Sequence, residues 1–473
     1  MTIKFGTAGW RGIIARDFTF DNLNLVMQAI ASWITEDNIT DNGVILGYDT
    51  RFMGREFAEH AACVLAAMGI PVRISRSVCS TPAISWAALE HDSVGVIITG
   101  SHNPPIYNGV KIKAPFGGPV SAYQSDDVEA RISDTDPDFK PGPLDEFLRN
   151  GLIRQIDLNG QYLTVLRRRI DTKRIRRSNI MIAHDSMYGA GQGLLRELLG
   201  SQILEIHSIF NPGYHGRAPE PKEENLRELA DFVVEHRCSI GLATDGDAER
   251  VGLFDEKGQY VDAHLILSLL TKYFARNKGL KGCVIKTFST THMLNRQAEK
   301  YGLILETTPV GFKYISEKML TCNVIIGGEE SGGMTVKGHI PDMDGIYISL
   351  LIIEMILESG KPLSILVREL FDEFGPNYNR RVDIELSEEH QKAVLSYIRQ
   401  NQLKEISGLA VVERETKDGT KLWLEDGTWI LVRSSGTEPL LRIYCESDTA
   451  EKARLFVDAV SELVTDKKVF QPS

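Results

Sequence analysis

A serine with basic neighbours stands out in the segment TGSHNPPIYNGVKIK, residues 99–113. Ser101 is followed directly by His102, and Lys111 and Lys113 come later in the same segment. A hydroxyl held on a stiff turn beside such groups could accept and return a phosphoryl group. An ordinary polar loop would contain the same residue types, because short motifs also arise by chance.

Three carboxylates alternate in the segment TDGDAER, residues 244–250. Alternate residues of an extended loop point the same way, so Asp245, Asp247 and Glu249 can converge on one point. Carboxylates that share a small volume need a cation between them, and their oxygen atoms favour Mg²⁺. A solvated acidic turn is the simpler alternative. A calcium-binding EF-hand loop is disfavoured, because it requires glycine where this segment has Arg250.

Two further segments offer polar groups to a ligand. In GGEESGG, residues 327–333, the alternating residues Glu329 and Ser331 could bind sugar hydroxyls together. Acidic residues in the first turn of a helix would give the same sequence pattern. In RSSGTEP, residues 433–439, a guanidinium, three hydroxyls and the backbone N–H groups around Gly436 form a compact anion nest. Phosphate is the expected ligand of this nest, and an ordinary hairpin turn is the alternative interpretation of the segment.

The strands that precede three of these segments would bring them together. Apolar runs rich in β-branched residues end in the serine, acidic and GGEESGG segments. Because ligands of α/β proteins gather at the carboxyl ends of strands, we expect the three segments to line a common cleft. A glycine-rich loop near the N-terminus, residues 5–12, adds Arg11 as a single strong anion donor.

The order of strands and helices predicts several domains. They alternate as far as about residue 375, which indicates βαβ units, and a smaller α+β pattern follows Gly375-Pro376. A chain of 473 residues is too long for one core. We therefore predict three α/β domains with mixed, largely parallel sheets and a smaller C-terminal α+β domain. Their predicted ranges are 1–150 with the serine loop, 151–259 with the acidic loop, 260–374 with the GGEESGG loop, and 375–473 with the anion-binding loop.

The composition excludes several classes of partner. A net charge of −11 argues against nucleic acid and anionic membranes. The arginine-rich run 167–177 contains no interleaved aromatic residues, so a solvated helix face is its favoured interpretation. The longest apolar run, 346–357, is interrupted by Glu354 and is too short to span a bilayer. Without a signal peptide, and with six cysteines read as buried free thiols, the protein is expected to be cytoplasmic.

The segments FGTAGWRG, TGSHNPPIYNGVK, DGDAER, GGEESGG and RSSGTEP, in this order, resemble the α-D-phosphohexomutase family, which includes phosphoglucomutase and phosphomannomutase. The resemblance covers essentially the whole chain. It implies four domains around a central cleft and an isomerase that interconverts hexose 1- and 6-phosphates of glucose, mannose or both. It further implies a phosphoserine, a bisphosphate sugar intermediate, Mg²⁺, a glucose 1,6-bisphosphate-type activator, and a monomer or homodimer that binds a small sugar phosphate.

The same resemblance assigns roles to individual residues. Ser101 is the phosphoserine, and with Asp245, Asp247 and Glu249 it binds Mg²⁺. The residues implied near the transferring phosphate are Arg11, His102 and Lys111, with Lys111 as the proton carrier and Arg250 closing the metal loop. The residues implied at the sugar and the second phosphate are Gly311 and Lys313 in a loop that senses sugar identity, Glu329 and Ser331 at the hydroxyls, and Arg433, Ser435, Gly436 and Thr437 at the non-reacting phosphate.

Two positions depart from the family pattern. The third metal ligand is usually aspartate, whereas this chain has Glu249. Many bacterial members carry histidine where this chain has Gly333, and His339 is a candidate substitute.

Three other functions fit the sequence less well. A phosphoglucosamine mutase usually has an alanine-serine pair where this chain has Gly100-Ser101, which favours glucose or mannose phosphates. A catalytically silent sugar-phosphate binding protein is disfavoured by the intact serine, acidic cluster and anion loop. A serine hydrolase is disfavoured because its nucleophile elbow needs glycine where Thr99 stands.

Overall fold

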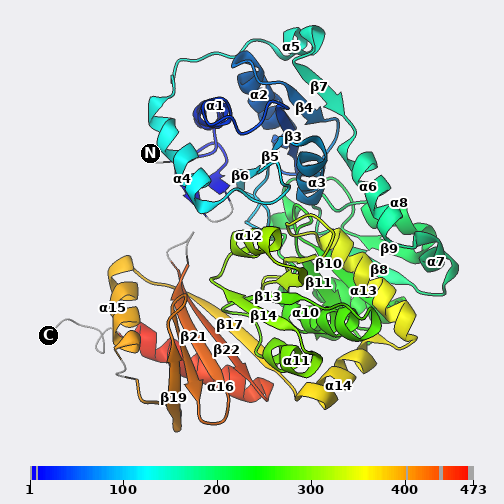
Figure 1. The fold of residues 1–473 in the computed structure, drawn as a ribbon, viewed down its shortest axis with the longest axis vertical. Coiled ribbons are helices and arrows are strands. Elements are labelled where there is room, and N and C mark those ends of the chain that lie inside the picture. Colours follow the sequence, from blue (N-terminus) through cyan, green and yellow to red (C-terminus); the bar gives the residue numbers. More distant parts are fainter. Residues whose placement is uncertain (1–2, 7–8, 401–402, 436–439, 467–473) are drawn as a thin grey trace.

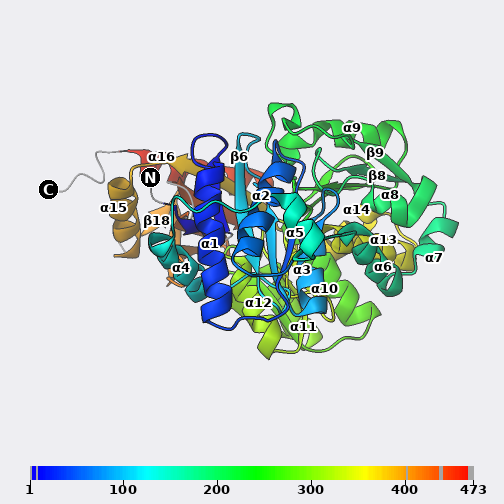
Figure 2. The same ribbon diagram turned by 90° about the horizontal axis from the view of Figure 1, so that it is seen from above.

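The computed structural model describes residues 3–6, 9–400, 403–435 and 440–466 of the chain. Within these ranges the strands form four separate sheets, one in each of four domains. Figure 1 shows the first domain, blue to cyan, at the top and the fourth, orange to red, at the lower left. In Figure 2 the second and fourth domains lie toward opposite ends of the molecule. The predicted class, three α/β domains and a smaller α+β domain, is confirmed.

Domain I contains a seven-stranded mixed sheet in the order β1-β2-β6-β5-β3-β4-β7. All residues of β3 and β5 are buried, as expected for central strands that run parallel to each other beneath helices. Its strands are β1 (Phe5–Gly6), β2 (Gly9–Ile13), β3 (Val44–Tyr48), β4 (Val72–Ser75), β5 (Val94–Ile98), β6 (Tyr107–Lys113) and β7 (Ile153–Ile156). Its helices are α1 (Phe20–Glu36), α2 (Gly54–Ala67), α3 (Thr81–His91), α4 (Ala122–Arg131) and α5 (Leu144–Asn150).

Domain II contains a five-stranded sheet in the order β12-β11-β10-β8-β9, with β8, β9 and β10 parallel. Its strands are β8 (Ile182–Asp185), β9 (Ile203–Ile206), β10 (Ile240–Thr244), β11 (Val251–Phe254) and β12 (Tyr260–Val261). The helices of this part of the chain are α6 (Leu158–Arg169), α7 (Thr172–Arg177), α8 (Leu194–Leu199) and α9 (Arg227–Glu235).

Domain III contains a four-stranded sheet in the order β14-β13-β15-β16. Its strands are β13 (Cys283–Thr287), β14 (Ile304–Thr308), β15 (Val324–Gly328) and β16 (Met334–Val336). Its helices are α10 (Ala263–Lys272), α11 (Met293–Tyr301), α12 (Phe312–Thr321), α13 (Gly345–Ser359) and α14 (Leu363–Phe374).

Domain IV contains a six-stranded sheet in the order β17-β22-β21-β20-β19-β18, and every neighbouring pair is antiparallel. Its strands are β17 (Tyr378–Glu385), β18 (Glu405–Ile406), β19 (Leu409–Glu415), β20 (Thr420–Leu424), β21 (Trp429–Ser434) and β22 (Leu440–Ser447). Its helices are α15 (Glu388–Arg399) and α16 (Ala450–Thr465).

Domains II and III share one hydrophobic core, whereas domains I and IV each have their own. Helix α13 accounts for the shared core, because it packs on β10 and β11 of domain II and on β16 of domain III. The apolar run 346–357 of the sequence forms most of this helix and is largely buried. Among the described residues, no helix has the length and apolarity needed to cross a bilayer.

The six cysteines are free thiols, as expected. Five are buried, and only Cys322, at the end of α12, is half-buried. Burial raises the pKa of Cys79 to about 12 and that of Cys63 and Cys283 to about 11. Burial therefore keeps these thiols protonated at neutral pH.

Candidate active site

Ser101 lies on a turn that directly follows β5. Its backbone φ of +52° is in the left-handed region, which residues other than glycine rarely adopt. The Ser101 N–H donates to Thr99 Oγ1 (2.7 Å), and Thr99 Oγ1 donates to Asp49 Oδ2 (2.5 Å). Ser101 and both of these partners are buried. The turn is therefore held by the residues at the ends of β3 and β5.

Arg51, which sequence reasoning did not single out, fixes the rest of this loop. Its buried guanidinium donates to the carbonyl oxygens of Ser101, Asn103, Pro104 and Tyr107 at 2.6–2.8 Å. The planar fork of arginine presents five N–H donors in a fixed arrangement, which suits it to binding four carbonyls at once. One feature of the sequence could have pointed to Arg51. The strand 44–48 runs into the polar segment DTR, just as other strands run into the serine and acidic segments.

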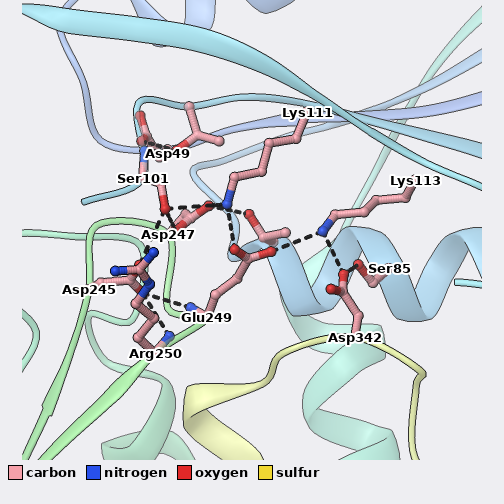
Figure 3. A network of polar contacts seen from close by, with 12 residues as sticks. Asp49, Ser85, Ser101, Lys111, Lys113, Asp245, Asp247, Glu249, Arg250 and Asp342 are labelled. Atoms are coloured by element: carbon pink, nitrogen blue, oxygen red, sulfur yellow. Dashed lines mark hydrogen bonds and ion pairs between the residues drawn. The ribbon is translucent and has the colours of Figure 1, made fainter. Parts of the chain in front are cut away.

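The acidic loop between β10 and β11 reaches the serine from domain II. Ser101 Oγ lies 2.9 Å from Asp247 Oδ1 and 3.3 Å from Asp245 Oδ2 (Figure 3). Asp245 Oδ1 accepts the N–H groups of Glu249 (2.8 Å) and Arg250 (2.9 Å), which shapes the loop. The structure thus brings Ser101, Asp245 and Asp247 together although they are far apart in sequence.

Glu249 is turned toward two lysines instead of toward Ser101. Lys111 Nζ donates to Glu249 Oε2 (2.5 Å) and to Asp247 Oδ2 (2.5 Å), and it lies 3.3 Å from Ser101 Oγ. Lys113 Nζ donates to Glu249 Oε1 (2.9 Å) and to Asp342 Oδ2 (2.6 Å), as Figure 3 shows. Alternating charges from domains I, II and III therefore form one buried chain. The role of Asp342 carried no signal in the sequence.

Burial and neighbouring charges set the protonation of this cluster. Burial, followed by the charge of Asp247, raises the pKa of Asp245 well above its ordinary value. Burial acts in the same direction on Asp247, but the Lys111 ammonium together with hydrogen bonds from Thr81 and Ser101 outweighs it and lowers the pKa of Asp247. Burial and the cationic Arg250 hold the pKa of His102 well below its ordinary value, so its imidazole is neutral at neutral pH. Burial lowers the pKa of Arg11 to about 10, which leaves it charged.

The donors around Ser101 fit a hard divalent cation. Mg²⁺ is usually held by one or two carboxylates together with phosphate oxygens, and Asp245 and Asp247 converge beside a serine hydroxyl. In the described part of the chain, no three His, Cys, Asp or Glu side chains are placed to hold a metal ion. At this site, Lys111 and Lys113 bind the Glu249 carboxylate, and Lys111 also binds that of Asp247.

The GGEESGG loop lies beside the acidic loop. Arg250 and Gly333 form a β-bridge, and Val251 N–H donates to Gly332 O (3.2 Å). Glu329 Oε1 accepts a hydrogen bond from Ser331 Oγ (2.6 Å), whereas Glu329 Oε2 is buried with no hydrogen-bond partner among the described residues. Such an oxygen is suited to accept a ligand hydroxyl.

The Gly333 departure has a steric basis in this chain. A Cβ atom at Gly333 would lie 2.2 Å from Met343 Sδ, so a histidine there would have to displace that side chain. His339 Nε2 lies 2.6 Å from Asp344 Oδ2, and its ring packs against Tyr347. The contacts of His339 are therefore with the start of α13, and none joins it to Ser101 or Glu329.

The predicted phosphate and sugar-sensing residues meet where domain IV touches domain III. Arg433, at the end of β21, is buried, and its Nε lies 3.3 Å from Asp418 Oδ1. Ser435 follows it, whereas Gly436 and Thr437 lie outside the described residues. Gly311 immediately precedes α12, and Lys313 Nζ lies over the ring of Tyr314.

Four family profiles match consecutive parts of the chain. Three, described as the α/β/α domains I, II and III of phosphoglucomutase/phosphomannomutase, match residues 2–138, 160–258 and 262–374. The fourth, described as the C-terminal domain of phosphoglucomutase/phosphomannomutase, matches residues 387–463.

Individual relatives are similar along their whole length. A phosphoglucomutase/phosphomannomutase of Thermococcus kodakarensis is 31% identical over 467 residues, which is 98% of each chain. A "probable phosphoglucosamine mutase" of Pyrococcus abyssi is 30% identical over 467 residues, again 98% of each. The crystal structure of a "putative phosphomannomutase" from Thermus thermophilus superposes with a TM-score of 0.85 and 32% identity, covering 98% of this chain and 99% of that one.

Proposed function

Because this chain belongs to the phosphoglucomutase/phosphomannomutase family, whose members are mutases, we propose that it interconverts the 1- and 6-phosphates of glucose, mannose or both. The reaction passes through a phosphorylated Ser101 and a bisphosphate sugar. The enzyme works in the cytoplasm as a monomer or homodimer. It uses Mg²⁺ and an activator of the glucose 1,6-bisphosphate type, which first phosphorylates Ser101.

The observation that carries this proposal is the set of groups around Ser101 Oγ. Carboxylates of domain II lie 2.9 and 3.3 Å from this oxygen, and Lys111 Nζ of domain I lies 3.3 Å from it. All of these side chains are buried. Phosphoryl transfer requires mainly positioning and charge stabilisation, which such a pocket of fixed charges provides.

Each half-reaction moves one phosphoryl group and one proton. The free sugar hydroxyl attacks the phosphorus of phosphoserine, the bond from phosphorus to Ser101 Oγ breaks, and the hydroxyl proton replaces the one that Lys111 gives to the serine oxygen. Lys111 Nζ donates a proton to the departing serine oxygen, and it takes that proton back when the serine is phosphorylated again. Asp245, Asp247 and the phosphoserine would hold Mg²⁺, which would supply positive charge to neutralise part of the phosphoryl charge.

The remaining site residues hold the sugar phosphate. Glu329 Oε2, which has no hydrogen-bond partner in the described part of the chain, accepts a sugar hydroxyl beside Ser331. Arg433 binds the phosphate that does not react. After the first transfer the bisphosphate turns end for end, and its other phosphate returns to Ser101. The same arginine therefore serves both phosphates in turn.

Phosphoglucosamine mutase is the second candidate, since a relative of 30% identity has that name. The two candidates differ in the substituent at one sugar carbon. Gly100 before the serine favours glucose and mannose phosphates. Assays on glucose, mannose and glucosamine phosphates decide between the candidates.

The test combines turnover with protein mass. The purified enzyme, with Mg²⁺ and glucose 1,6-bisphosphate, should convert hexose 1-phosphate to 6-phosphate in a coupled assay. It should also gain one phosphoryl group by intact-mass analysis. Ser101→Ala should lose both properties, whereas Ser133→Ala, which changes an exposed serine, should keep both. Substantial turnover by Ser101→Ala would reject the phosphoserine assignment.

A further inference from the structure

The turn between β19 and β20, residues 416–419, connects domain IV to domain III. Lys417 Nζ donates to Thr307 O (2.8 Å), and Asp418 Oδ2 accepts the N–H of Val310 (2.8 Å). Thr307 is near the end of β14, and Val310 belongs to the loop that leads into α12. Two neighbouring side chains of domain IV thus fix the segment that carries the predicted sugar-sensing residues.

The second oxygen of the same carboxylate faces the predicted phosphate anchor. Asp418 Oδ1 lies 3.3 Å from Arg433 Nε, a buried nitrogen that makes no hydrogen bond within the described residues. The turn also packs directly on β21, because a Cβ atom at Gly419 would lie 2.5 Å from Arg433 Cβ. Gly419 has a φ of +81°, which further favours glycine at this position.

The loop before α12 depends on this contact from domain IV. Pro309 has no N–H to donate, and α12 begins at Phe312, after Gly311, which has no side chain to cap the helix. A helix start of this kind is usually fixed by a local Ser, Thr or Asp. Asp418 of domain IV instead binds the Val310 N–H, just before the helix, and so fixes the chain that leads into it.

We propose that Asp418 is a positioning residue that couples the phosphate anchor at Arg433 to the sugar-sensing loop, residues 309–313. The assignment rests on the proposed function for the roles of these two partners. An anion that binds Arg433 competes for its positive charge, so Asp418 interacts less with Arg433 and more with the Val310 N–H. Binding of phosphate at Arg433 therefore orders the sugar-sensing loop, residues 309–313.

Two substitutions separate the two contacts of Asp418. Asp418→Ala removes both, whereas Asp418→Asn keeps an acceptor oxygen for Val310 and removes the charge beside Arg433. The side chain of Asp418 is 22% exposed, so neither substitution leaves a buried cavity. Asp426→Asn is the matched control, because Asp426 lies in the turn between β20 and β21 at the other end of the sheet.

The first measurement is amide hydrogen exchange of the segment 304–314, with and without inorganic phosphate. In the wild type and in Asp426→Asn, phosphate should slow the exchange by about 3- to 10-fold, the factor that one ordinary hydrogen bond supplies. In Asp418→Ala the exchange should be faster and insensitive to phosphate. In Asp418→Asn the segment should be protected from exchange, but its exchange rate should be equally insensitive to phosphate.

The second measurement is the ratio of kcat/KM for glucose 1-phosphate to that for mannose 1-phosphate. This ratio should change about threefold or more in Asp418→Ala and stay near the wild-type value in Asp418→Asn. Wild-type exchange and an unchanged ratio in Asp418→Ala would overturn the proposal. If the wild type turned over no sugar phosphate, the proposed function would fail, and the exchange experiment would still decide the role of Asp418.

Discussion

Ser101 and Glu329 are two buried residues that each adopt an energetically costly arrangement. Ser101 is held in a left-handed conformation by Thr99, which costs of order 1–3 kcal/mol for a residue other than glycine. Glu329 is buried, and one of its carboxylate oxygens has no hydrogen-bond partner among the residues that the structure describes. Both costs are concentrated where a substrate would touch the protein, which is where strained and unpaired groups are usually found.

The protonation of Glu329 predicts a pH dependence of substrate binding. Burial, followed by the charge of Glu330, raises the pKa of Glu329 to about 7. The ionised form is the better hydroxyl acceptor, so KM should fall as the pH rises through about 7. Glu329→Gln should have a higher KM that lacks this change. KM should be measured for both proteins between about pH 6 and 8, because the substrate phosphate titrates equally in both. Parallel pH profiles of KM in the wild type and in Glu329→Gln would contradict the role of Glu329 as the acceptor of a sugar hydroxyl.

At the scale of elements, the serine loop is a rigid platform because Arg51 holds four of its carbonyls. The guanidinium also lies over the ring of Tyr214, which belongs to domain II. Strand β3 thus supports the loop that follows its neighbour β5. The loop is ordered by a side chain and not by its own backbone bonds alone.

Arg51→Lys should weaken both stability and catalysis. One ammonium cannot serve four carbonyls, and each buried carbonyl left unpaired costs about 1–3 kcal/mol. The free energy of unfolding should fall by a few kcal/mol in urea titrations, and kcat should fall with it. The control is Arg55→Lys, at an exposed ion pair with Glu59, which should change stability by less than about 1 kcal/mol. Wild-type values of both quantities in Arg51→Lys would contradict this role.

The sequence predicted those features of the elements that depend on local pattern. Buried strands such as 94–98 and the polar loops after them follow from β-branched runs and turn residues. The convergence of Asp245 and Asp247 followed from the same reasoning. The orientation of Glu249 did not, because it depends on Lys113 and Asp342 from two other domains. Arg51 was missed for a similar reason, since its partners lie in a loop after another strand.

At the scale of the whole molecule, we propose that the candidate site draws on all four domains. Domain I supplies Ser101 and Lys111, domain II the acidic loop, domain III Glu329, and domain IV Arg433. The shared core of domains II and III keeps two of these contributions on one body. The pattern of strands and helices predicted four domains, but not which of them share a core, because that depends on how helix α13 packs in three dimensions.

Arg433→Gln tests whether Arg433 of domain IV binds each phosphate of the bisphosphate intermediate in turn. A charged hydrogen bond contributes about 1.5–3 kcal/mol, so KM should rise by about 10- to 100-fold. The bisphosphate should also escape more readily, and the variant should depend more strongly on added glucose 1,6-bisphosphate. Arg454→Gln, at an exposed arginine of α16, is the control for domain IV. Steady-state rates with and without added bisphosphate give both quantities. An unchanged KM would remove Arg433 from the site.

The distribution of the cysteines gives the natural chain a single convenient place for a fluorescent label. Five cysteines are buried, while Cys322, at the far end of α12, is half-buried and therefore the most accessible of the six. A maleimide dye used sparingly should therefore attach there first. Its emission would then follow the helix next to Val310 during turnover, without any engineered cysteine.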